Sequence, residues 1–98
     1  MILIRDIFQL KFGRAKDAMA LLKEGTQLMK KAGHAPDRVL TDLVGNFYSL
    51  VMETTANNLS EFEATMKEAF KDDTFEKWYQ KFIPLVESGR REIFNIIE

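Results

Sequence analysis

The sequence contains no cysteine, one histidine and two prolines among its 98 residues. Without cysteine there can be no disulfide and no thiolate metal site, which agrees with a reducing compartment. No stretch approaches the roughly 20 apolar residues that a membrane-spanning helix needs. The opening letters MILI are also too short for the core of a signal peptide. We therefore expect a cytoplasmic protein that does not associate with membranes.

Neither sign of charge is in excess, because 14 basic and 15 acidic side chains leave a net charge of −1. A nucleic-acid-binding surface needs a basic excess or a basic stripe, and the sequence has neither, so we expect no nucleic-acid partner. The single histidine, His34, lies between a predicted helix end and Pro36, which predicts a solvated loop position without a role. One histidine without cysteine cannot build a multi-ligand His/Cys metal site, and we expect no metal.

The chain has the size and composition of a single domain spanning residues 1–98. Hydrophobic residues make up 46% and charged residues 30%, which is typical of a globular protein. A domain this small buries only about two thirds of the surface that its unfolded chain exposes. A second copy of the chain is therefore expected to cover some of the remaining apolar surface.

The hydrophobic periodicity changes along the chain between the strand and the helix period. Residues 2–12 predict a strand, with Asp6 on the same face as Phe8, and residues 15–32 predict an amphipathic helix that ends at Gly33. Residues 38–44 and 47–55 predict two strands around Gly45-Asn46. A second helix begins near residue 60, a short one follows it, residues 88–89 predict a loop, and residues 91–97 predict the closing strand.

Helix starts in the second half of the chain have more than one candidate cap. Ser60 with Glu63 has the spacing of a capping box, and Asn57 or Asn58 offers an alternative. For the short helix, Asp73 or Thr74 is the expected cap.

The order β-α-β-β-α-β predicts an α+β, ferredoxin-like fold: a four-stranded antiparallel sheet with its helices on one face. With a two-residue turn at Gly45-Asn46, the uncovered face would carry apolar residues among charges that can pair. This mixture favours a subunit interface over an open surface. The predicted interface residues are Leu40, Val44, Phe47 and Val51.

The passage FEKWYQKFIPLVESGRREIF, with Phe82-Ile83-Pro84-Leu85 leading to Gly89, together with the element order, resembles the dimeric α/β-barrel superfamily. It is most similar to the NIPSNAP-like members and is also similar to antibiotic-biosynthesis-monooxygenase-like ones. The resemblance implies a homodimer with two sheets stacked face to face and a pocket between sheet and helices. It does not imply one chemistry, because the superfamily contains monooxygenases, haem-degrading enzymes and small-molecule binders.

Haem degradation is disfavoured by the residues themselves. The haem-degrading members of the superfamily that this chain resembles use an asparagine on the first strand, together with a tryptophan and a histidine on the helical side. The first strand here offers Asp6 instead, and no histidine follows Trp78. We therefore expect no cofactor.

Asp6 is the one candidate catalytic residue. A carboxylate placed on the helix-covered face would have a raised pKa, as a general base requires. Two alternatives remain open: a bulge near Arg5 would change the face, or Asp6 pairs with an arginine.

Large aromatic and methionine side chains favour an apolar ligand pocket, although most such side chains belong to the core in a domain of this size. The expected pocket residues are Phe8, Tyr48, Met52, Phe62, Met66, Trp78 and Tyr79. The sequence thus predicts a homodimeric binding protein for a small apolar molecule, fatty-acid-like or an aromatic carbonyl compound. Two alternatives stand beside it: a cofactorless monooxygenase or isomerase, and a non-catalytic interaction dimer. The residues do not decide whether the protein is an enzyme.

Overall fold

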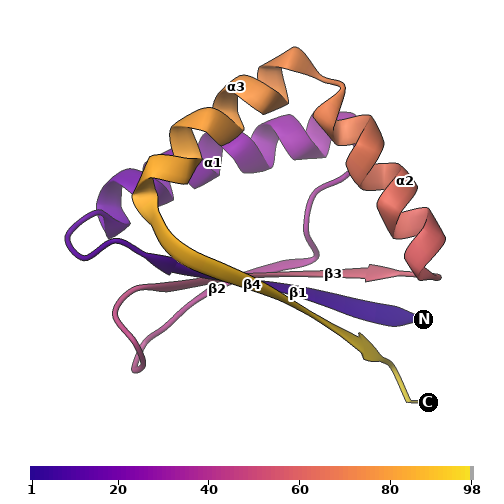
Figure 1. The fold of residues 1–98 in the computed structure, drawn as a ribbon, viewed down its shortest axis with the longest axis horizontal. Helices are drawn as coiled ribbons and strands as arrows, with labels where there is room; N and C mark the ends of the chain where they lie inside the picture. Colours follow the sequence, from indigo (N-terminus) through magenta and orange to yellow (C-terminus); the bar gives the residue numbers. More distant parts are fainter. Residues whose placement is uncertain (98) are drawn as a thin grey trace.

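One layer of the molecule is a four-stranded antiparallel sheet, and the other consists of three helices that all lie on one face of it (Figure 1). The computed structural model describes residues 1–97. The strand order is β2-β3-β1-β4, with β1 (Ile2–Leu10), β2 (Arg38–Thr41), β3 (Ser49–Ala56) and β4 (Val86–Asn95). The helices are α1 (Ala15–Ala32), α2 (Leu59–Phe70) and α3 (Asp73–Phe82), followed by a short 3-10 helix at Ile83–Leu85. This is the predicted ferredoxin-like α+β fold.

The strand register decides which side chains face the helices. Asp6 is opposite Met52 in β3, and Phe8 is opposite Leu50. Because side chains alternate along a strand, these residues share the face that the helices cover, while Ile7 points to the open face. The buried core at one end of this layer consists of Leu10, Ala18, Leu22, Leu50, Trp78, Phe82 and Leu85.

Helices α1 and α3 pack through an indole ring placed over a glycine. Trp78 lies so close to Gly25 that a Cβ atom added there would overlap the ring. The Nε1–H of Trp78 donates to the Leu21 carbonyl oxygen at 2.6 Å. Trp78 also stacks on Phe82, with ring centroids 5.3 Å apart. This contact fixes the upper layer as one packed unit.

Helix α1 has the predicted bounds, and the expected glycine ends it: Gly33 has a left-handed φ of 79°. For α2, the structure selects one of the alternatives, since the side chain of Asn58 accepts a hydrogen bond from the Glu61 N–H at 2.9 Å. For α3, the expected caps are wrong by one or two positions. Asp72 is the cap and accepts from the Thr74 N–H at 2.9 Å.

The predicted two-residue hairpin turn is wrong, although the predicted register is right. Leu40 pairs with Val51 and Arg38 pairs with Glu53, as expected, but β2 ends at Thr41 and residues 42–48 form the connection. The physical reason is that a side chain takes the place of a backbone partner. Asp42 Oδ1 accepts a hydrogen bond from the Ser49 N–H at 2.9 Å.

The same loop is held by a second side chain. Gln9 Nε2 donates to the carbonyl oxygens of Asn46 at 3.1 Å and Phe47 at 2.6 Å. Consequently Val44 and Phe47 do not lie on a strand, which corrects their predicted placement. They are 94% and 68% exposed, and the loop bends toward the open side of the sheet (Figure 1).

Two strand ends also differ from expectation. The residues predicted as a loop, Ser88 and Gly89, lie inside β4 opposite Gln9 and Phe8. A Cβ at Gly89 would stand 2.9 Å from Phe8 Cδ1, so the glycine permits close approach within a strand and does not mark a turn. Strand β1 ends two residues earlier than predicted, which leaves Phe12 exposed beyond it.

Candidate functional site: a cavity between the sheet and the helices

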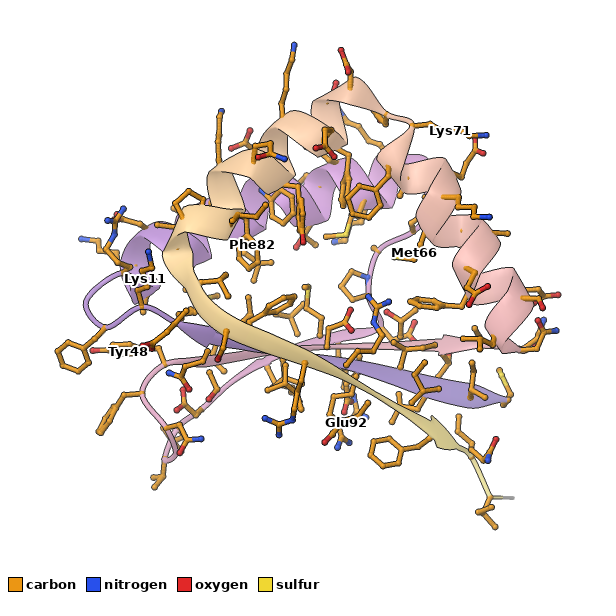
Figure 2. All side chains as sticks on the ribbon, in the orientation of Figure 1. Lys11, Tyr48, Met66, Lys71, Phe82 and Glu92 are labelled. Carbon is orange, nitrogen blue, oxygen red and sulfur yellow. The ribbon has the colours of Figure 1, made fainter. Side chains whose placement is uncertain are left out.

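A cavity of about 920 Å³ lies between the sheet and the helical layer. Its walls come from β1, β3 and β4 below, from α2 and α3 above, and from the loop that follows α1. Helix α2 rises from the end of β3, beside the sheet, to the start of α3, so it stands as the outer wall (Figure 1). Figure 2 shows Met66 and Phe82 pointing into this region, whereas Glu92 points away from the opposite face.

The cavity brings together most of the predicted pocket residues. Six of them line it: Phe8, Met52, Phe62, Met66, Trp78 and Tyr79. Tyr48 does not, which corrects the prediction. It precedes β3 in the 42–48 loop, so strand alternation does not apply to it. It lies beside Phe12, at 5.8 Å between ring centroids, and Phe47, at 6.1 Å.

Sequence reasoning missed part of the lining. Phe82 and Phe70 reach the cavity from the predicted helical stripes, and periodicity alone could not separate them from core residues. Met29 and the half-buried His34 contribute from the end of α1 and the loop after it. His34 therefore lies in a loop, as predicted, but also borders the cavity, because its backbone N–H donates to Met29 O and turns the chain inward.

A salt bridge between neighbouring strands forms one polar part of the cavity wall. Asp6 and Arg91 are register partners of β1 and β4. Arg91 Nε lies 2.6 Å from Asp6 Oδ1, and its second contact, Nη2 to Oδ2, measures 3.1 Å. The pairing is therefore bidentate, the strong arrangement for arginine and carboxylate.

The surroundings of Arg91 fix the guanidinium further. Its Cζ lies 4.9 Å from the centre of the Phe62 ring in α2, a cation–π geometry. The pKa of Arg91 is raised, first by the hydrogen bond that it donates to Asp6, against a smaller lowering by burial, with further electrostatic contributions from Asp6 and Tyr79. Arg91 is a fixed cation of the cavity wall.

The position of Asp6 on the helix-covered face agrees with its place in the strand alternation. The register shift in β1 lies between Gln9 and Leu10, not near Arg5. Of the alternatives left open by the sequence, pairing with an arginine is the one that the structure shows. The sequence did contain a signal for Arg91, because counting back in twos from Ile93 places it on the helix-facing side.

The indole N–H of Trp78 is already used inside the protein, as its bond to Leu21 shows. It is therefore not a free donor toward the cavity. The ring itself lines the space and contributes apolar surface.

The open face of the sheet carries a row of alternating charges in one register line. Arg38, Glu53, Arg5 and Glu92 are successive cross-strand partners from β2 to β4. Glu53 is only 3% exposed, and its oxygens lie 2.8 Å from Arg38 Nη2 and 2.9 Å from Arg5 Nε. The contact between Arg38 and Glu53 does not have hydrogen-bond geometry, so it is an ion pair.

An apolar line runs beside this charged row. Leu40 pairs with Val51, which pairs with Ile7. Both lines border a hollow of about 720 Å³ on this face. Of the predicted interface residues, Leu40 and Val51 therefore lie on the open sheet face, whereas Val44 and Phe47 lie in the adjoining loop.

Two features are absent from residues 1–97. No three histidine, aspartate or glutamate side chains come together in a way that would hold a metal ion. No helix in that range is both long enough and apolar enough to cross a membrane.

The element order, the strand order and the one-sided helical layer define the ferredoxin-like fold. Neither a protein-family profile nor a curated protein matches the sequence. Solved structures do match. A NIPSNAP family protein from Agrobacterium tumefaciens has a TM-score of 0.92 and 13% identity, covering 99% of this chain and 86% of its own. An uncharacterized NIPSNAP domain protein from Burkholderia xenovorans has a TM-score of 0.89 and 11% identity, covering 99% and 95%.

A putative antibiotic biosynthesis monooxygenase from Nitrosomonas europaea also has this fold, with a TM-score of 0.74 and 9% identity over 100% of both chains. The expected resemblance to NIPSNAP-like and monooxygenase-like proteins is thus confirmed for the fold. At such identities the likeness concerns architecture and not activity.

Proposed function

We propose that this protein binds a small, largely apolar molecule, fatty-acid-like in shape or an aromatic carbonyl compound, in the cavity between sheet and helices. The observation that carries the proposal is the composition of the cavity wall. Aromatic and methionine side chains lie beside the paired charges of Asp6 and Arg91, and the remaining charged lining residues are Asp37, Glu61, Glu87 and Arg90. Ligand sites are commonly apolar with a few placed polar groups, and the volume lies within their usual range of roughly 300–1,000 Å³.

The wall suits a flexible guest. Met52 and Met66 approach from opposite layers, and methionine adapts its shape to irregular apolar ligands. Phe62 and Tyr79 add rigid rings.

We further propose that the functional unit is a homodimer in which the open sheet faces meet. The charged row is the support, because alternating signs can meet opposite signs of a second copy across a two-fold axis. Leu40, Val51 and Ile7 supply apolar surface beside it. The exposed Val44 and Phe47 extend that surface on the side to which their loop bends (Figure 1).

The second candidate is a cofactorless monooxygenase or isomerase. The fold of the putative monooxygenase from Nitrosomonas europaea supports it, as does the position of Asp6 in the cavity. Both oxygens of Asp6 already accept hydrogen bonds from Arg91, so protonation of Asp6 would weaken this salt bridge. This cost makes binding the favoured function. Turnover of a phenolic or polyketide-like substrate that is lost in Asp6→Asn would reverse the order.

A non-catalytic interaction dimer is the third candidate, and it makes no use of the cavity. The cytoplasm as compartment, and the expected absence of cofactor, membrane and nucleic-acid partners, remain predictions from composition and sequence pattern.

Calorimetry tests the proposed function directly. Titration of the protein with decanamide, a linear apolar amide, is expected to give saturable binding with a negative heat-capacity change, the mark of buried apolar surface. Trp78, the only tryptophan, lines the cavity and should change its fluorescence in parallel. Absence of saturable heat with a panel of linear and aromatic carbonyl compounds would contradict the proposal and favour the interaction dimer.

A further inference from the structure

The Asp6–Arg91 pair has no net charge, but Arg91 has N–H donors that Asp6 does not use. Asp6 occupies Nε and Nη2 of Arg91. Guanidinium carries five N–H donors, and within residues 1–97 Nη1 makes no hydrogen bond to a protein group. The wall therefore offers free N–H groups beside a carboxylate, and the Asp6–Arg91 pair itself has no net charge.

We propose that the Asp6–Arg91 pair makes the cavity select ligands with an uncharged carbonyl group, such as an amide, ketone or ester, over carboxylates of the same shape. The inference rests on the proposed binding function and names the ligand class for that site. The free N–H groups of Arg91 bind the carbonyl oxygen, and the apolar remainder lies against Met52, Phe62 and Met66.

Electrostatics decide between the two head groups. A carbonyl oxygen accepts from Arg91 without adding charge. A carboxylate at the same place is attracted by Arg91 and repelled by Asp6, whose charge balances that of Arg91, so the pair gives it little net Coulomb stabilisation. The desolvation cost of the ligand carboxylate is therefore left uncompensated.

The pair is also held in place, so a ligand carboxylate cannot easily displace Asp6 from Arg91. Asp6 and Arg91 are fixed opposite each other by the β1–β4 ladder. The Phe62 ring of α2 covers the guanidinium at 4.9 Å. Separating Arg91 from Asp6 would break two charge-assisted hydrogen bonds at once. The selectivity is therefore built into the strand register.

The test compares decanamide with decanoate, which have the same length and nearly the same head-group shape but differ in charge at pH 7. Wild-type protein is titrated with each by calorimetry. Decanamide is expected to bind more tightly by about tenfold, because its head group carries no charge to desolvate. In Asp6→Asn the charge of Arg91 is uncompensated, and the preference is expected to reverse toward decanoate.

A matched control removes a negative charge away from the cavity. Glu24→Gln changes the net charge as Asp6→Asn does, but Glu24 is exposed on α1 and does not line the cavity. It is expected to keep the wild-type preference for the amide.

The outcomes separate the two claims. Equal or tighter binding of decanoate by the wild-type protein would overturn the selectivity while leaving the binding function standing. An unchanged preference in a folded Asp6→Asn variant would also overturn it. Binding of neither compound, nor of any other carbonyl probe, would contradict the binding function itself, and the selectivity with it.

Discussion

The indole ring of Trp78 lies against Gly25, with so little space between α3 and α1 that the position admits no Cβ atom. Trp78 is anchored there by its hydrogen bond to the Leu21 carbonyl oxygen. The same ring forms part of the cavity wall on its other side. Packing of the helical layer and shape of the cavity thus depend on one residue.

Gly25→Ala is expected to destabilise the fold, although alanine favours helices by about 1 kcal/mol over glycine. The added methyl group must displace the Trp78 ring, and overpacking costs about 1–3 kcal/mol. Urea unfolding at fixed protein concentration measures the difference. Ala20→Gly, at an exposed position of α1, serves as the control for helix propensity alone. A more stable Gly25→Ala protein would show that the contact is not tight.

Glu53→Gln is expected to lower the free energy of unfolding by about 1 kcal/mol. Glu53 is buried between Arg5 and Arg38, and hydrogen bonds to charged groups contribute about 1.5–3 kcal/mol. The exposed arginines reduce this through solvent screening. Glu92→Gln, with longer ion-pair distances of 3.8 and 3.4 Å, should cost less than about 0.5 kcal/mol. Equal effects in thermal and urea unfolding would refute the distinct role of Glu53.

Val51→Lys is expected to convert the proposed dimer into a monomer. The substitution places a lysine at the centre of the apolar line on the open face, where a second copy would bury its charge. Sedimentation velocity at micromolar concentration reports the mass. Met19→Lys, on the outer side of α1, should leave the dimer intact. A wild-type protein that sediments as a monomer would contradict the proposed homodimer.

Met66→Trp is expected to abolish binding of decanamide without unfolding the protein. Met66 points into the cavity from α2 (Figure 2), and the larger ring fills space that the ligand would occupy. Calorimetry measures the loss, and circular dichroism confirms the fold. Met19→Trp makes the same exchange away from the cavity lining and should bind normally. Undiminished affinity in Met66→Trp would place the ligand elsewhere.

Much of the fold follows from local sequence patterns. The helix from Ala15 to Ala32 and its glycine end were predicted residue for residue, and the pairing of Leu40 with Val51 was right. The errors arose where a side chain replaces a backbone partner or a glycine serves packing. Asp42 takes the N–H that a longer hairpin would have used. Gly89 makes room for Phe8 and does not form a turn.

The cavity was predictable in composition but not in its polar centre. Helical and strand periodicity placed Phe8, Met52 and Met66 on the inner faces, where they lie. The partner of Asp6 depends on which strand lies beside β1 and in what register, a long-range fact that no local window contains. Tyr48 was misplaced for a related reason: β3 begins at Ser49, two residues later than predicted, so Tyr48 lies in the preceding loop.

Native mass spectrometry after incubation with decanamide tests the central claim most directly, because it reports assembly and occupancy together. The expected species consists of two 11.4 kDa chains, carries one or two decanamide molecules and releases them on denaturation. A protein that binds no decanamide and no other carbonyl probe under these conditions, whether monomer or dimer, would contradict the central claim.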